Sequence, residues 1–139
     1  MMGAKYIRSA YTGVTVSDAL LGCIVYERAQ GQVDIATDGS VEPLGVVVNI
    51  EPDDRLVIAG VGSTAYVVLS EDFEYSDCKT FVATTDGKAA VFTPAAGTVT
   101  TATVTWSVGQ VILPYEGKGA AGSQQECYIC PKIEVVKAS

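Results

Sequence analysis

Short runs of β-branched residues separated by turn-forming residues constrain the fold of this chain most. Four runs lie between residues 32 and 70, namely VDIA (33–36), GVVVNI (45–50), LVIA (56–59) and AYVVL (65–69). Each run is bounded by Gly, Pro, Asp or Ser, which favour turns. The pattern is typical of consecutive paired strands, and it contains no nucleophile beside a base and no cluster of metal ligands.

The second half of the chain continues the same pattern and ends in a strand pair around residues 128–129 and 133–136. Asp38-Gly39 and Asp86-Gly87 are turn signals, because both residue types tolerate positive φ. The GVVVNI run is apolar on both sides of its alternation, which predicts a strand covered on both faces, in a barrel wall or at a subunit contact. We predict an all-β fold, a β-barrel of about ten short strands without a helix of ordinary length.

The two halves also show a weak internal repeat. Cys23, the turn near Gly31, the strand that starts at Gly45 and the strand around Tyr66 have apparent counterparts in the second half. The counterparts are Cys78, the turn at Gly87, the strand that starts at Gly109 and the strand around Tyr128. The spacing differs in the middle, where the second half is longer by residues 98–106. We therefore expect an internal duplication within one β domain, residues 14–139.

The first 13 residues carry aromatic and aliphatic side chains between charged ones, without a clear period. We expect residues 1–13 to form a flexible arm, because chain ends are loose unless a partner holds them. Tyr6, Ile7 and Tyr11 are then candidate contacts to a partner. The alternative is that Tyr6 and Ile7 begin an edge strand.

Charge and hydropathy narrow the choice of partners. Sixteen acidic and nine basic residues give a net charge of −7, and no basic run is present. An anionic nucleic acid or membrane surface would repel such a chain. No apolar stretch approaches the roughly 20 residues of a spanning helix, and the N-terminus lacks the apolar centre of a signal peptide. We expect neither nucleic acid nor membrane as a partner.

The residue types give little support to catalysis. The chain has no histidine, which removes the commonest general base and metal ligand at neutral pH. Cys127 and Cys130 have a zinc-like interval, but on a strand they point to opposite faces about 10 Å apart. We expect no metal, no cofactor and no enzyme activity, with buried free thiols. The redox state of the four cysteines, including Cys23 and Cys78, stays open.

Two other features are explained more simply without a functional site. Residues 70–79 concentrate four acidic side chains, but they lack the ligand spacing of a calcium loop. They predict a solvated acidic turn, with one helical turn opened by Ser70 as an option. Trp106 could stack on a sugar, although in an alternating run it is more often core or interface. One rival function is a ligand- or glycan-binding β-module of a phage or bacterial surface structure, which would use Trp106 and nearby tyrosines. The other is a hydrolase with an unrecognised carboxylate pair.

The order of these signals resembles the small capsid decoration, or cement, proteins of tailed bacteriophages. The residues that carry the resemblance are Asp38-Gly39 before the strand starting Gly45-Val46, the turn from Gly60 to Gly62, and Val108-Gly109 before the last strands. The resemblance covers residues 20–136. The four cysteines and the long segment 98–106 depart from the family pattern.

The resemblance implies a β-barrel or β-tulip-like protein that binds the outside of an expanded capsid, often as a homotrimer. Its partners would be the major capsid protein and copies of itself, and its location the virion surface after synthesis in the host cytoplasm. A standard interface of about 1,600 Å², repeated over the lattice, would be enough to strengthen the shell. Tyr6, Ile7 and Tyr11 are the candidate capsid contacts.

Overall fold

The fold consists of short strands, as the alternating runs predict. The structure is a computed structural model that describes residues 6–13, 15–75, 79–92, 103–114 and 116–136. The described residues contain twelve strands and two short 3-10 turns, somewhat more than the ten strands expected. None of the helices among the described residues is long and apolar enough to cross a membrane.

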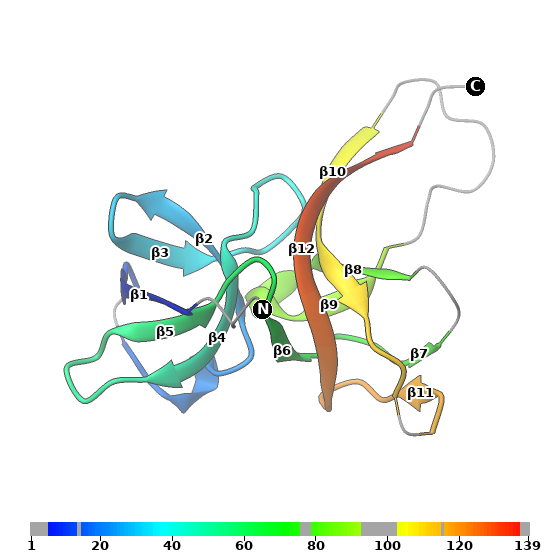
Figure 1. The fold of residues 1–139 in the computed structure, drawn as a ribbon, viewed down its shortest axis with the longest axis horizontal. Helices are drawn as coiled ribbons and strands as arrows, with labels where there is room; N and C mark the ends of the chain where they lie inside the picture. The colour runs from blue at the N-terminus through cyan, green and yellow to red at the C-terminus, as the bar shows by residue number, and fades with distance from the viewer. Residues whose placement is uncertain (1–5, 14, 76–78, 93–102, 115, 137–139) are drawn as a thin grey trace.

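The strands form two five-stranded sheets and one small two-stranded sheet (Figure 1). The first sheet contains β1 (Tyr6–Tyr11), β2 (Ile24–Ala29), β3 (Gln32–Ile35), β4 (Gly45–Ile50) and β5 (Leu56–Ala59). The second sheet contains β6 (Thr64–Val68), β8 (Thr80–Ala83), β9 (Ala89–Val91), β10 (Thr103–Val111) and β12 (Gln124–Val136). The small sheet pairs β7 (Phe73–Glu74) with β11 (Lys118–Gly119). The 3-10 turns are η1 (Asp18–Leu20) and η2 (Thr85–Gly87).

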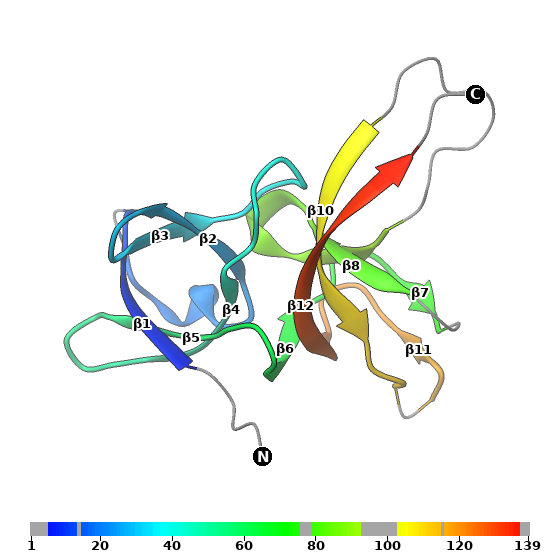
Figure 2. The same ribbon diagram turned by 45° about the horizontal axis from the view of Figure 1, so that its top comes forward.

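The first sheet is a closed barrel with the strand order β1-β3-β2-β4-β5, and Figure 2 shows its ring of strands. The closing strand β1 runs antiparallel to β5 and parallel to β3. The flexible arm expected over residues 1–13 is therefore wrong for residues 6–11. These residues form a strand, as in the alternative, but it is not an edge strand, since β1 lies between β3 and β5. Without this strand the barrel would have two open edges.

The second sheet repeats the first, strand by strand. Strands β1, β2, β3, β4 and β5 correspond to β6, β8, β9, β10 and β12, with the same order and directions. The register also agrees: Val25 of β2 pairs with Gly45 of β4, and Phe81 of β8 pairs with Gly109 of β10. The internal duplication predicted from the sequence is therefore present in the fold.

The parallel contact that closes the barrel recurs in the second sheet as well. Tyr11 pairs with Val33 in the barrel, and Leu69 pairs with Ala89 at the corresponding place. In both sheets the next residue along the chain also bonds to the partner strand. The N–H of Thr12 donates to the carbonyl of Val33 at 3.0 Å, and the N–H of Ser70 donates to the carbonyl of Ala89 at 2.9 Å. The second contact is a single bridge rather than a strand pair, so the second sheet is the more open copy.

Of the counterparts predicted from the sequence, the turn pair and the glycine-strand pair are correct, and the tyrosine pair is not. The turns at Gly31 and Gly87 and the strands at Gly45 and Gly109 do correspond. Tyr66 lies on β6, which matches β1, whereas Tyr128 lies on β12, which matches β5. The prediction failed there because both strands offer the same Tyr-plus-apolar pattern.

The position that corresponds to Cys23 is Lys79. The carbonyl of Cys23 accepts from Val47 N–H at 3.0 Å, and that of Lys79 accepts from Val111 N–H at 3.1 Å. Cys78, the counterpart expected from the sequence, lies outside the described residues.

The second copy differs from the first by a long two-stranded extension, which we call the ribbon. The ribbon consists of residues 103–107 of β10 paired with residues 132–136 of β12, and it projects from the body of the molecule (Figure 2). Part of the extra segment 98–106 noted in the sequence therefore forms one strand of this ribbon. A bulge between Ser107 and Gly109 separates the ribbon from the sheet.

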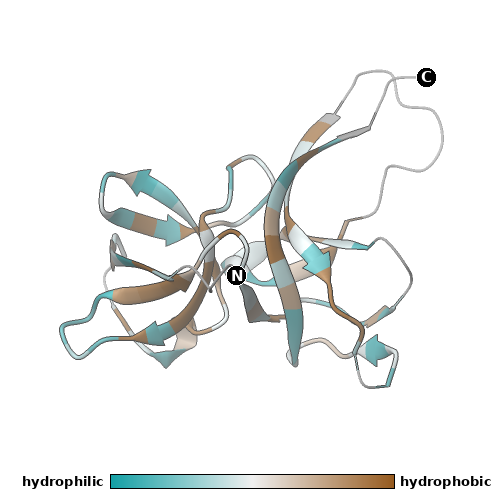
Figure 3. Cartoon of the chain, in the orientation of Figure 1, coloured by the Kyte–Doolittle hydropathy of each residue, from teal (hydrophilic) through white to brown (hydrophobic). Residues whose placement is uncertain are grey.

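Two apolar clusters hold the fold together. The barrel interior is filled by Leu20, Val25, Val33, Val47, Leu56 and Ile58. The larger cluster lies inside the second sheet and also takes in Ile24, Ala36, Val46 and Ala59 from the barrel. Figure 3 shows β4 and β5 as largely apolar strands.

The GVVVNI strand is covered on both faces over its first half, as predicted. Val47 faces the barrel interior, while Val46 packs against the second sheet of the same chain. Its second half differs from the prediction, because Val48 and Asn49 are exposed. The cover on the second face is thus intramolecular.

Candidate interaction surface

The three predicted partner contacts on β1 have different surroundings. Tyr6 is 54% exposed. Ile7 and Tyr11 are half-buried and pack against the cluster inside the barrel. Burial raises the pKa of the Tyr11 hydroxyl, and the charges of Asp34 and Cys23 add to the effect. Only Tyr6 therefore presents most of its side chain to a partner.

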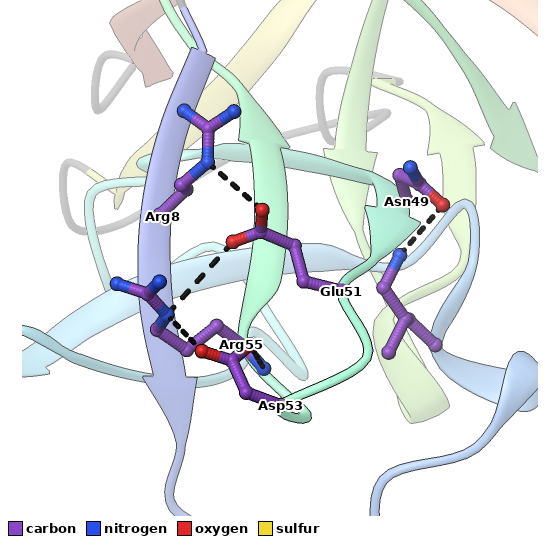
Figure 4. Close-up of polar contacts among 6 residues, drawn as sticks. Arg8, Asn49, Glu51, Asp53 and Arg55 are labelled. Atoms are coloured by element: carbon purple, nitrogen blue, oxygen red, sulfur yellow. Dashed lines mark hydrogen bonds and ion pairs between the residues drawn. The ribbon is translucent and has the colours of Figure 1, made fainter.

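Polar contacts also tie β1 to the turn between β4 and β5 (Figure 4). Arg8 Nε lies 3.2 Å from Glu51 Oε2, and Arg55 Nε lies 3.8 Å from Glu51 Oε1 and 2.8 Å from Asp53 Oδ2. Bonding to the Arg55 backbone N–H leads the causes that hold the pKa of the Asp53 carboxyl below its ordinary value. These exposed ion pairs position the turn against β1.

Two tyrosines form an exposed surface on the neighbouring strands β6 and β12, which we call the tyrosine face. Tyr66 is 55% exposed and Tyr128 is 40% exposed. Their register places Tyr66 opposite Glu126 and Tyr128 opposite Thr64, so the two rings are diagonal neighbours on one side of the sheet. The intervening residues point inward and are buried. The sheet therefore holds both rings outward on a well-packed support.

A groove of about 460 Å³ borders the tyrosine face. Tyr66 lines it together with Leu113, whose side chain is 64% exposed, and Pro114. Gln125 also lines the groove and donates from Nε2 to the carbonyl of Ile112 at 2.6 Å, which ties β12 to the residue before Leu113. Apolar side chains beside a groove are what a protein partner can bury.

The cysteines that the structure describes are free thiols. Cys23 and Cys127 are buried and Cys130 is half-buried. Cys127 and Cys130 both lie on β12, as the strand interpretation of this segment predicts. Burial raises the pKa of the Cys127 thiol to about 12 and also raises the pKa of Cys23. Within the described residues, no group of three or more Cys, Asp, Glu or His side chains is placed to hold a metal ion.

The acidic segment lines a cavity of about 700 Å³. Its described part contains strand β7 and no helical turn, so the option of a turn opened by Ser70 is wrong for residues 70–75. Asp72 accepts a hydrogen bond from the N–H of Ala121 at 2.7 Å, and Phe73 packs edge-on against Phe81. The pairing of β7 with β11 explains why the backbone of residues 73–74 is extended. Lys79 and Lys118 also line this cavity and balance part of its charge.

A second cavity, of about 430 Å³, brings together Asp34, Asp38 and Asp86. The hydroxyl and N–H of Ser40 donate to Asp38 and lower the pKa of its carboxyl. Asp38 is thus ionised at neutral pH and suited to accept hydrogen bonds rather than to donate a proton.

Trp106 is half-buried on the ribbon.

Sequence reasoning missed most of the exposed apolar residues. Tyr66, Tyr128, Leu113, Val104 and Ile133 are all at least 40% exposed. The strict alternation of the β6 run, in which Tyr66 takes a polar position, is a signal that could have identified it. Tyr128 needed the register of β12, which depends on the pairing with β6.

No protein-family model, curated protein or solved structure matches the chain.

Proposed function

We propose that the chain is a structural virion protein that binds the outer surface of a tailed-phage capsid and stabilises the head. The observation that carries the proposal is the tyrosine face, where exposed aromatic rings are held outward by a packed sheet beside a groove lined by both apolar and charged side chains. Tyrosines are enriched at protein interfaces because they bury a large area with little loss of conformational entropy. The resemblance to decoration proteins supplies the partner class.

The arrangement of the two copies supports a binding role. The barrel and the second sheet share one apolar cluster, so the tyrosine face is attached to a body that resists deformation. A decoration protein must transmit load between capsid subunits, and a rigid body does this better than a flexible one. Its partners are the major capsid protein and other copies of itself, with a homotrimer as the state that the resemblance implies.

The test is co-sedimentation of the purified protein with expanded shells of its own phage. We expect the double variant Tyr66→Ser/Tyr128→Ser to lose at least about tenfold in affinity, because each buried tyrosine at an interface centre contributes a kcal/mol or more. Val48→Ser is the matched control, since Val48 is an exposed apolar residue on the barrel. Tyr6→Ser tests the contact predicted from the sequence.

The outcomes separate the alternatives. Loss of binding in the double variant with unchanged binding of Val48→Ser supports the proposed surface. Loss only in Tyr6→Ser would move the contact to β1. A wild-type protein that does not sediment with shells would refute the proposed function.

A further inference from the structure

In the part of the chain that the structure describes, the ribbon has one covered edge and one open edge. On the β10 side, the N–H of Trp106 donates to the carbonyl of Gly39 at 2.8 Å, so the loop between β3 and β4 covers the edge at this point. On the β12 side, β6 pairs only with Gln124 to Tyr128. Among the described residues, no strand pairs with β12 beyond that point on this side.

The backbone groups along the open edge point outward. Opposite residues of an antiparallel pair alternate between hydrogen-bonded and non-hydrogen-bonded pairs. Trp106 lies opposite Ile133, and its N–H points away from β12 toward Gly39. The pair is therefore of the non-hydrogen-bonded kind, and the N–H and carbonyl of Ile133 point away from β10. By the same alternation, those of Val135 do too.

The charges on this edge are complementary to a second copy of themselves. Lys132 and Glu134 flank Ile133, and Lys132 is exposed while Glu134 is half-buried. In an antiparallel pairing centred on Ile133, Lys132 of one copy lies opposite Glu134 of the other, twice by symmetry. A register centred on Glu134 would instead place two carboxylates opposite each other, which is unfavourable.

We propose that the open β12 edge of the ribbon pairs antiparallel with the same edge of a second copy of this chain, about a two-fold axis at Ile133. The two ribbons then form one four-stranded sheet. Its apolar side carries Val104 and Ile133 from each copy, which are 58% and 52% exposed in the single chain. Pairing satisfies the outward backbone groups that otherwise make an edge prone to nonspecific association.

The ribbon is well placed for this role because the fold does not need it. The first copy of the duplicated unit closes without such an extension. The inference rests on the part of the proposed function in which the chain binds copies of itself. Its test uses no shells, so self-association and shell binding can fail separately.

The test is sedimentation velocity of the full chain over a range of concentrations, at low and high salt. The pairing predicts an even-numbered assembly, not the isolated homotrimer that the resemblance implies, and this assembly should weaken as salt rises. Lys132→Glu and Glu134→Lys each replace two attractive pairs by two repulsive ones, so each should raise the dissociation constant at least about tenfold. The double variant Lys132→Glu/Glu134→Lys restores the attraction and should return close to the wild-type value.

A third variant tests the edge itself. Ile133→Pro removes an N–H that points outward, so it should abolish association while the unfolding midpoint stays near that of the wild type. Glu134→Lys removes one hydrogen-bond acceptor of the Ser107 hydroxyl, at 3.3 Å. The hydroxyl keeps a second acceptor, the carbonyl of Lys132, which also lies 3.3 Å away. A wild-type monomer at every concentration would overturn the inference. So would an assembly that survives the single charge changes or Ile133→Pro.

Discussion

At the scale of single residues, two glycines record the duplication most clearly. A Cβ at Gly45 would overlap the carbonyl oxygen of Ala59, and a Cβ at Gly109 would overlap the carbonyl oxygen of Tyr128. Ala59 and Tyr128 occupy corresponding places on β5 and β12. Each glycine lets two backbones approach closely at the same point of the repeated unit.

We expect Gly45→Ala and Gly109→Ala to lower the free energy of unfolding by similar amounts, about 2–3 kcal/mol or more, because backbone atoms cannot move aside easily. Gly31→Ala is the control, since Gly31 has open space around it and only its positive φ opposes a side chain; it should cost about 1 kcal/mol. Urea unfolding measures all three. A harmless Gly109→Ala beside a severe Gly45→Ala would contradict the equivalence.

The buried thiol of Cys127 makes stability depend on pH in the alkaline range. Its pKa is about 12 in the folded protein, against 9.0 for an ordinary thiol. The unfolded chain therefore loses this proton first, and the contribution is constant below pH 9. Above pH 9 the free energy of unfolding should fall by up to about 1.4 kcal/mol per pH unit.

The measurement is urea unfolding under reducing conditions at several pH values on both sides of pH 9. Cys127→Ala should show a shallower alkaline decline than the wild type, because it lacks the buried thiol. Cys130→Ala, at a half-buried thiol on the same strand, should retain the wild-type slope. Equal slopes in all three proteins would show that Cys127 is not protected by burial.

At the scale of elements, the place of β1 in the barrel wall decides which variants can test the partner contacts of the N-terminus. It supplies the wall of the barrel between β3 and β5, so removing it exposes two strand edges and the Ile58 side chain inside. A truncated chain that fails to bind shells would therefore reveal nothing about contacts. Point variants such as Tyr6→Ser are the better probes of this strand.

We expect deletion of residues 1–13 to lower the free energy of unfolding by at least about 2 kcal/mol, because buried apolar contacts and a strand pair are lost. Glu51→Gln is the milder comparison and should cost less than about 1 kcal/mol, since its arginine partners are more than half exposed. Thermal unfolding followed by circular dichroism compares the two. A truncated chain as stable as the wild type would restore the arm interpretation.

At the scale of the whole molecule, local patterns predicted the strands and turns but not all of their partners. Runs such as GVVVNI and the Asp86-Gly87 turn could be located because alternation and turn chemistry are local properties. The correspondence between β1 and β6, the strand that carries Tyr66, could not be predicted in this way, because it depends on strand pairing between residues far apart in the chain. For the same reason the tyrosine face and the ribbon were not predicted.

The binding of the outer capsid surface through the tyrosine face is the central claim, and electron cryo-microscopy of shells incubated with the protein tests it most directly. We predict density for the protein on the outside of the shell, with β6 and β12 turned toward the capsid. The same shells with Tyr66→Ser/Tyr128→Ser should be nearly bare. Shells that remain bare with the wild-type protein, or that carry it with β6 and β12 facing outward, would contradict the account.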